Sequence, residues 1–404
     1  LARLPSPRTR RRAAVRAAAH RRQLDTALLA WRELWHPQPF REARPAWCEQ
    51  WPALTAALLA LDDAEAARLN DDAPAALRWL AGYLPEVDSL LPLIDVPVAE
   101  NKPPSVPGER WAWEIPGRKR AQIEAFAGAV QPGGAGVIDW CGGKGHLGRL
   151  LGLAWQKPVH TLEIDAALCA DGEQLAGRIG LAHRFLERDA LAVADWPQHG
   201  QQAVALHACG NLHRRLVEHG AGAGVARFDL APCCYYRGVD THYQPLSGGG
   251  QLQLSRDDTR LAVTETVTAS KRLTRQRDHG IAWKLAFTSW REQFGGVSYK
   301  SFKPVPAPWL RGSFADFLAC MAAREGLPAP DKRHLEAIEA VGWQRQGEVI
   351  RLSIPRHAFR RAIELWLVLD LAEYLGERGY ESRLSTFCDR QLTPRNLLLT
   401  ARRM

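Results

Sequence analysis

The chain lacks the long apolar runs and the dense cysteines that mark membrane proteins and secreted disulfide scaffolds. No uninterrupted apolar stretch approaches the ~20 residues of a membrane span, although 46% of the 404 residues are hydrophobic. Eight cysteines are few for so long a chain, and because we find no secretory segment we expect reduced thiols. We therefore predict a soluble, cytoplasmic protein with no membrane partner, long enough for two or three domains. Its oligomeric state is left open.

Lysine is also scarce. It accounts for only nine of the 53 basic residues, so arginine carries nearly all of the positive charge, and the net charge is +9. Such basicity is compatible with an RNA partner, but part of the excess lies in residues 1–22, which hold eight arginines and no acid. A nucleic-acid arm and a transit peptide are alternatives for this segment. We expect a flexible basic tail over residues 1–23, because termini are usually disordered unless tied down.

The remaining chain is predicted to contain two domains. Residues 24–94 should form a helical N-terminal domain, since leucine and tryptophan recur there at spacings of three and four. Prolines then interrupt the pattern, and we expect a linker over residues 95–109. Residues 110–404 are predicted as the second domain, with an insertion at about 240–355 in which the regular pattern is lost.

Strands and helices alternate through the second domain. The predicted strands are 136–140, 159–164, 183–187, 202–207 and 226–231, and the helices between them are 146–155, 166–179 and 212–219. This spacing implies an α/β fold with a parallel, doubly wound, Rossmann-like sheet. A helix at 362–375 and two closely spaced strands at 381–387 and 396–400 follow. Such an ending, with an antiparallel last strand, is expected of a class I methyltransferase sheet.

A glycine-rich turn follows the first predicted strand and opens the next helix. Glycines allow positive φ and the close approach of a ligand, and a helix start offers N–H donors that have no partner within the helix. Glu163 ends the second predicted strand, twenty positions after Gly143. Strand, glycine turn, helix, strand and acid describe the first half of a nucleotide-binding βαβ unit. We therefore predict an adenosine-containing cofactor.

Two cofactors compete for this turn. Gly143, Gly145 and Gly148 fit the dinucleotide spacing G-x-G-x-x-G. The alternative is the first motif of class I S-adenosylmethionine methyltransferases, D-x-G-x-G-x-G, read here as Asp139, Cys141, Gly143 and Gly145 with cysteine in place of the first glycine. An acid before the glycines suits a cationic sulfonium or ammonium group and repels a pyrophosphate, so electrostatics favour S-adenosylmethionine.

Two later strand ends carry cysteines and a histidine. Residues 206–212 read Leu-His-Ala-Cys-Gly-Asn-Leu, and residues 232–235 read Pro-Cys-Cys-Tyr. Ligands of open α/β sheets bind beyond the carboxyl ends of the strands. We therefore expect the methyl-transfer site to be faced by His207, Cys209, Cys233, Cys234 and Tyr235.

Together, the glycine turn and these two segments resemble one methyltransferase family. It is the group that contains methyltransferase-like 25 and the methyltransferase part of the glutathione S-transferase C-terminal domain-containing protein. The tRNA acceptor-stem 2′-O-methyltransferases are similar more distantly. The resemblance covers about residues 137–238 and implies S-adenosylmethionine as cofactor, with Glu163 on the ribose hydroxyls and Asp189 near the adenine. The candidate cofactor-binding residues are Asp139, Cys141, Gly143, Gly145, Glu163, Asp189 and His207.

The cysteines have three interpretations. As a nucleophile, Cys233 or Cys234 would attack a pyrimidine carbon, which requires a thiolate near a cation. As zinc ligands, His207, Cys209, Cys233 and Cys234 are suitable types but lack the usual gap of two to four residues. We favour the third, in which small, buried cysteines shape the pocket, and so predict no metal.

Methyl transfer from a sulfonium requires positioning more than acid–base chemistry. A hydroxyl or amine acceptor must still lose a proton, and His207 and Tyr235 are the candidate bases beside Cys233 and Cys234. For His207, a structural role is the alternative. The basic chain and the tRNA-modifying relatives favour an RNA acceptor, with protein as the nearest alternative. A nicotinamide-dependent oxidoreductase and a non-catalytic RNA-binding protein remain open.

Overall fold

The computed structural model describes residues 7–106, 108–248, 250–265, 271–294, 301 and 303–404. They form two compact units. The sheet unit comprises the described residues of 1–30, 92–268 and 360–404, and the helical unit those of 31–91 and 269–359. Each unit is therefore assembled from segments far apart in the sequence.

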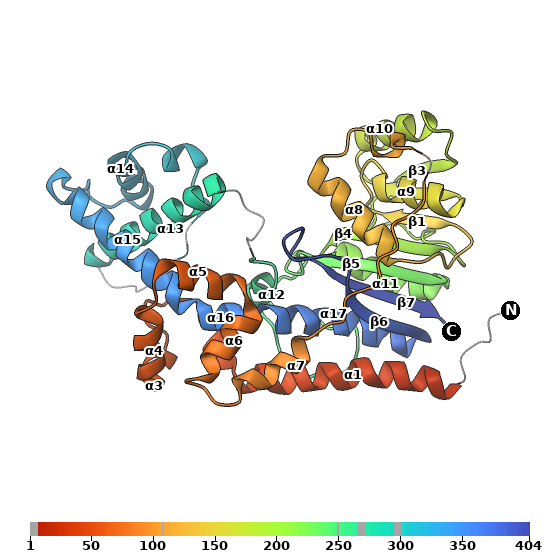
Figure 1. The fold of residues 1–404 in the computed structure, drawn as a ribbon. Coiled ribbons are helices and arrows are strands. Elements are labelled where there is room, and N and C mark those ends of the chain that lie inside the picture. Colours follow the sequence, from red (N-terminus) through yellow and green to blue (C-terminus); the bar gives the residue numbers. More distant parts are fainter. Residues whose placement is uncertain (1–6, 107, 249, 266–270, 295–300, 302) are drawn as a thin grey trace. The chain divides into compact units, whose positions relative to one another are not determined.

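A seven-stranded sheet in the order β3-β2-β1-β4-β5-β7-β6 is the centre of the sheet unit (Figure 1). Its strands are β1 Val137–Trp140, β2 Val159–Glu163, β3 His183–Glu187, β4 Gln202–Cys209, β5 Arg227–Cys233, β6 Tyr380–Thr386 and β7 Leu397–Arg403. Neighbouring strands from β3 to β5 are parallel, whereas β7 is antiparallel to both β5 and β6. The predicted α/β, Rossmann-like sheet, parallel with an antiparallel last strand, is confirmed.

Helices supply further apolar side chains to the core of the sheet unit. They are α1 Pro7–Ala30, α7 Leu91–Ile94, η2 Arg110–Ala112, α8 Gly117–Ala129, α9 His146–Trp155, α10 Ala166–Gly177, α11 Asn211–Ala223, α12 Arg256–Leu261 and α17 Arg360–Glu377. One core cluster joins Phe126 of α8, Leu150 of α9, Val204 of β4 and Phe387 after β6, all buried. Because the cluster includes β1 and α9, it fixes the turn between them.

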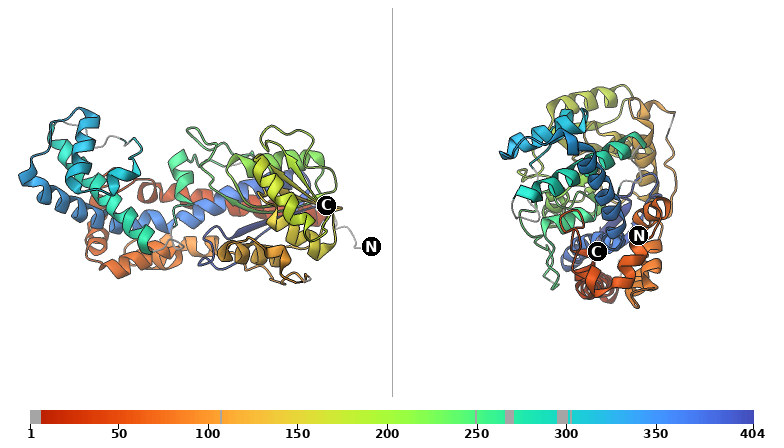
Figure 2. Two further views of the ribbon diagram at one scale, coloured as in Figure 1. Left: turned by 90° about the horizontal axis from the view of Figure 1, so that it is seen from above. Right: turned by 90° about the vertical axis from the view of Figure 1, so that its left-hand side faces the viewer.

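Helix α1 covers much of the segment that we predicted to be a flexible tail over residues 1–23. Residues 1–6 lie outside the described part, but Pro7–Ala30 forms one helix that runs along α17 and beside β6 (Figures 1 and 2). The helix is tied down by long-range contacts: buried Asp25 accepts hydrogen bonds from Trp366 Nε1 at 3.0 Å and from the backbone N–H of Leu252 at 3.0 Å. These partners are too distant in sequence for composition to reveal them.

The predicted linker over residues 95–109 also has a partner. Val98 forms a parallel bridge with Thr386 of β6, and the N–H of Ala99 donates to the Thr386 carbonyl at 2.8 Å. The segment therefore lies against the outer edge of the sheet. An edge strand with its backbone groups paired is protected from other chains.

The helical unit combines two segments of the chain, one before and one after the first five strands of the sheet. Its helices are α2 Arg32–Trp35, α3 Trp47–Gln50, α4 Pro52–Leu59, α5 Asp63–Asp71, α6 Ala73–Ala81, η1 Val87–Leu90, α13 Lys271–Arg291, η3 Glu292–Phe294, η4 Ala307–Leu310, α14 Phe314–Glu325, η5 Lys332–His334, α15 Leu335–Leu352 and α16 Ile354–Ala358. We predicted residues 24–94 as a domain of their own and 240–355 as an insertion. In the structure, α5 and α6 pack on α16, and α4 packs on α15, so much of the insertion completes the helical unit.

Among the described residues, no helix combines the length and apolar character needed to cross a membrane.

Candidate functional site

The strand order changes direction at β1, whose neighbours β2 and β4 lead to opposite edges of the sheet. Ligands of open α/β sheets bind beyond the carboxyl ends of the strands at this point. The glycine turn leaves β1 there, and α9 begins at His146 with Gly145 as its N-cap. Because β4 and β5 run parallel to β1, their cysteine-bearing ends reach the same edge of the sheet.

Two glycines of the turn serve different purposes. Gly145 has φ +61°, and a Cβ added there would lie 2.6 Å from His183 Cε1 and 2.7 Å from Phe185 Cζ. Gly143 has φ +60°, but an added Cβ would meet no atom within 4 Å. Gly145 therefore lets the turn pack against β3, whereas Gly143 borders open space that a ligand can enter.

Glu163 braces this turn from the end of β2. One carboxylate oxygen accepts the Gly143 N–H at 2.9 Å, and the other accepts the N–H groups of Ile164 at 2.9 Å and Asp165 at 3.2 Å. The side chain is only half-buried. A carboxylate has about four acceptor sites, so capacity remains for hydroxyl donors of a ligand.

Asp139 acts from beneath the turn. Its side chain is buried and accepts the Gly148 N–H at 2.9 Å, and a Cβ added at Gly142 would lie 2.6 Å from its carboxyl oxygen. Burial raises its pKa to about 6, although the Gly148 hydrogen bond opposes this shift. In the structure, the Asp139 carboxyl group therefore supports the turn itself.

Cys141 occupies the position of the missing first glycine. It adopts φ +56°, so the turn keeps the left-handed conformation that a glycine would give. Burial, assisted by the charges of Glu163 and Asp139, raises its pKa to about 12. Cys141 is therefore a neutral thiol at physiological pH.

Beyond β3, Asp189 lies at the surface and accepts the Leu191 N–H at 2.9 Å. The Arg188 N–H donates to the Glu163 carbonyl at 2.9 Å, which brings the ends of β2 and β3 together. Two exposed apolar side chains stand beside these acids: Ile164 is 65% exposed and Leu191 is 49% exposed. Sequence analysis missed both. Neither side chain has a distinctive signal in the sequence.

His207 and Tyr235 differ in their surroundings. His207 is half-buried, has φ +67°, and burial lowers its pKa to about 4, with the Arg395 charge acting in the same direction. Tyr235 is 2% exposed, and its hydroxyl donates to Glu364 Oε1 and to the Pro232 carbonyl, both at 3.4 Å. Burial raises the Tyr235 pKa well above its ordinary value. We predicted both as bases, but Tyr235 is a core hydrogen-bond donor and only His207 retains the properties of a neutral base.

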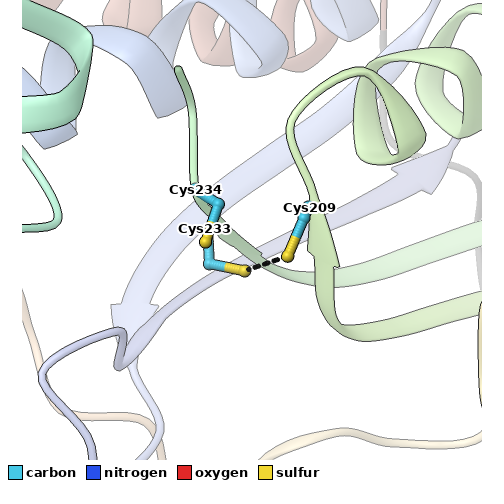
Figure 3. Close-up of side chains that lie close together, drawn as sticks. All are labelled: Cys209, Cys233 and Cys234. Carbon is cyan, nitrogen blue, oxygen red and sulfur yellow. Dashed lines mark hydrogen bonds between the residues drawn. The ribbon is translucent and has the colours of Figure 1, made fainter. Parts of the chain in front are cut away.

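The thiols of Cys209, Cys233 and Cys234 converge at the ends of β4 and β5. Their three Sγ atoms all lie within 4.8 Å of one another, and those of Cys209 and Cys233 are 3.4 Å apart (Figure 3). His207, considered above as a fourth zinc ligand, is not part of this group in the described structure. Cys233 is buried, whereas Cys209 and Cys234 are only partly so.

Exposed arginines and an aromatic ring lie next to the thiols. The Arg260 guanidinium stacks over the Tyr236 ring at 5.6 Å from its centroid. A hydrogen bond with Tyr236 raises the pKa of Arg237, which is also exposed. This group supplies positive charge and a flat ring two residues from Cys234.

Residues 118–239 match the family model described as a methyltransferase domain, and the match runs from α8 to just beyond the Pro-Cys-Cys-Tyr segment. No curated protein matches the chain. Solved structures that match include a geranyl diphosphate methyltransferase in complex with S-adenosylmethionine, at 16% identity over 34% of this chain and 62% of that one, with a TM-score of 0.25.

Two others are an O-methyltransferase from a Brevibacillus brevis multienzyme and an rRNA methylase from Streptococcus thermophilus. The first has 15% identity over 34% of this chain and 52% of that chain, with a TM-score of 0.25. The second has 14% identity over 34% of this chain and 94% of that chain, with a TM-score of 0.23. The chain thus spans about half to three fifths of the first structures it matches. Likenesses this distant carry no argument about function.

The matched segment, residues 118–239, is thus similar to a methyltransferase domain, and it contains the glycine turn and both cysteine-bearing strand ends.

Proposed function

We propose that this chain is a methyltransferase that binds S-adenosylmethionine at the carboxyl ends of β1, β2 and β3 and methylates RNA. Finer assignment to the methyltransferase-like 25 group is part of the proposal and rests on the three motifs given above. The observation that carries it is the Glu163 carboxylate, which joins the glycine turn to β2 beside the open space at Gly143.

Several described residues fit such a cofactor. Glu163 retains acceptor capacity for two ribose hydroxyls. The exposed faces of Ile164 and Leu191 suit a flat base, because a ligand that covers them removes apolar surface from water. Asp189 lies beside Leu191 as a partner for the adenine amino group, and Asp139 and Cys141 keep the turn in shape. When bound, the cofactor supplies a methyl group on a sulfonium that is open to in-line attack.

In the proposed reaction, the chain's own residues hold the acceptor and accept its proton. His207 stands at the end of β4 as a neutral imidazole at pH 7, because burial lowers its pKa to about 4. A neutral ring nitrogen can accept a proton from a hydroxyl or amine. Cys233 and Cys234, predicted above as catalytic, are assigned a different role in the next subsection.

RNA is proposed as the acceptor on electrostatic grounds. The chain carries a net charge of +9, and Arg260, Tyr236 and Arg237 place two cations and a ring next to the end of β5. Guanidinium groups bind phosphates, and aromatic rings stack on unpaired bases. A protein acceptor has no comparable support in these residues.

Cofactor identity is tested by titration calorimetry with S-adenosylhomocysteine and, in parallel, NADH. Micromolar binding of the former alone is expected, and binding of NADH alone would refute the methyltransferase proposal in favour of an oxidoreductase.

RNA binding is tested by filter binding of a bulk tRNA and rRNA pool across a salt series. Arg260→Ala should weaken binding and flatten the salt dependence, because one phosphate contact is lost. Arg184→Ala, exposed on β3, is the matched control. Methyl transfer from labelled cofactor into protein fractions but not into RNA would overturn the RNA acceptor.

A further inference from the structure

The three clustered thiols form a group that methyl transfer does not require. Cys209 is the last residue of β4, Cys233 is the last residue of β5, and Cys234 follows it. The ends of two neighbouring parallel strands therefore supply all three sulfurs. Figure 3 shows the Cys209 and Cys233 side chains pointing toward each other across the gap between these strands. None of the other free cysteines belongs to a comparable group in the described part of the chain.

Local backbone conformation brings the sulfurs together. Consecutive residues of an extended strand point to opposite faces, which would separate Cys233 from Cys234. Cys234 instead adopts φ +46°, and this turns its side chain back toward its neighbour. On β4, the register shifts between Leu206 and Cys209, and Cys209 becomes the direct partner of Cys233. A positive φ is costly for a residue other than glycine, and β-bulges are over-represented next to active sites.

We propose that Cys209, Cys233 and Cys234 bind one thiophilic divalent cation, with Zn²⁺ as the physiological candidate. Three thiolate ligands select soft or borderline cations over Mg²⁺ or Ca²⁺. Zn–S bonds of about 2.3 Å in a tetrahedron place two sulfurs about 3.8 Å apart. The Sγ atoms of Cys209 and Cys233 are 3.4 Å apart, and all three Sγ atoms lie within 4.8 Å of one another. Small side-chain rotations would therefore bring the three sulfurs to the spacing of zinc ligands.

Charge and exposure support this assignment over simple packing. Cys209 and Cys234 are partly accessible, unlike apolar cysteines that fill a core. The guanidinium groups of Arg237 and Arg395 place positive charge near the thiol cluster. These two guanidinium groups offset the negative charge of a metal–thiolate centre, and cation binding would release the thiol protons.

The proposed site has three protein ligands, so a fourth position stays available. Sites of this kind hold water or a substrate atom at that position, whereas closed structural sites use four protein ligands. The position lies at the same sheet edge as the glycine turn, because β1, β4 and β5 are parallel. A cation here would hold an acceptor atom near the transferred methyl group.

Metal binding is tested on the full chain, purified under reducing conditions and freed of metal by chelation. Titration with Co²⁺ should produce near-ultraviolet thiolate-to-metal absorption that saturates at one ion per chain, and Zn²⁺ should displace it. No thiolate absorption would overturn the proposal. Because this titration uses the wild-type chain, it does not depend on whether a variant folds.

Single substitutions then locate the site. Cys209→Ser and Cys234→Ser should each weaken Co²⁺ binding more than ~100-fold, since losing a ligand exceeds the 10–100-fold effect of losing a supporting group. Cys320→Ser in α14 is the matched control and should bind like the wild type. Equal Co²⁺ affinities in all chains would overturn the proposal. So would a protein that is purified without reductant, contains a Cys209–Cys233 disulfide, and still fails to bind metal after that disulfide is reduced. S-adenosylhomocysteine calorimetry on the same variants keeps this result separate from the proposed methyltransferase function.

Discussion

The Glu163 carboxylate and the Gly143 backbone N–H are joined by a 2.9 Å hydrogen bond. The bond ties the end of β2 to the turn that leaves β1, twenty residues earlier in the chain. A charged acceptor strengthens such a bond relative to a neutral one. The Glu163 side chain therefore both holds the glycine turn in place and supplies negative charge at this edge of the sheet.

Glu163→Ala should lower the affinity for S-adenosylhomocysteine at least tenfold. Each hydrogen bond to a charged acceptor is worth ~1.5–3 kcal/mol, and the proposed ribose contact contains two. Calorimetry measures the change. Glu187→Ala is a close control, because Glu187 is the register partner of Glu163 on β3 and is exposed. An affinity loss of the same size in both variants would argue against a ribose contact at Glu163.

Two glycine substitutions in the turn should separate packing from ligand access. Gly145→Ala forces a Cβ to 2.6 Å from His183 and should destabilise the fold by ~3 kcal/mol or more, the upper range for overpacking. Gly143→Ala meets no atom within 4 Å and should cost only the ~1–2 kcal/mol of a left-handed alanine, while obstructing the ligand.

Urea unfolding gives the stability of both variants, and calorimetry gives the ligand affinity of Gly143→Ala. If Gly143→Ala bound S-adenosylhomocysteine like the wild type, the open space beside this glycine would not be the ligand position.

Asp139 should make stability fall as pH rises through the weakly acidic range. Its pKa is raised by burial to about 6 from an ordinary value of 3.8, so the folded state binds more protons than the unfolded state between these values. The stabilisation is complete below about pH 4 and is lost as pH rises through about 6. It amounts to ~3 kcal/mol, taking 1.36 kcal/mol for each pKa unit.

Urea unfolding between pH 4 and pH 7 tests this against Asp139→Asn, which cannot ionise. The wild type should lose stability relative to the variant across this interval. If the free energy of unfolding depended on pH in the same way for the wild type and Asp139→Asn, the Asp139 carboxyl group would not have the raised pKa.

Asp25→Ala should destabilise the sheet unit by about 3 kcal/mol, because it leaves two buried donors and one partly buried donor without an acceptor. These are the Trp366 indole N–H and the backbone N–H groups of Gln251 and Leu252. Buried unsatisfied groups cost ~1–3 kcal/mol each, and structural relaxation recovers part of that sum. Thermal unfolding measures the loss. The neighbouring exposed Thr26→Ala should have little effect, and equal losses in the two variants would show that the Asp25 hydrogen bonds are not the cause.

Sequence patterns determined the elements whose signals are local. The helix 146–155 and the strand 183–187 were predicted with the bounds that α9 and β3 have, because glycines and apolar periodicity punctuate them. The strand ends then placed Asp139 and Glu163 at one edge of the sheet. Ile164 and Leu191 were missed because an exposed apolar residue has no distinctive pattern until its exposure is known.

Tertiary structure alone decided the features that depend on distant partners. The helical unit joins residues 31–91 to 269–359. Many helices have an apolar face with the same periodicity, so the sequence pattern does not indicate which two faces pack together. Likewise, adjacency made Cys233 and Cys234 poor candidates for one metal ion until the φ of +46° at Cys234 turned both sulfurs the same way. The sequence by itself determined where the strands and helices around the glycine turn follow one another along the chain, and which acidic, histidine and cysteine residues lie at the strand ends. Which ends meet, and at what distances, followed from packing energies that couple residues far apart in the chain.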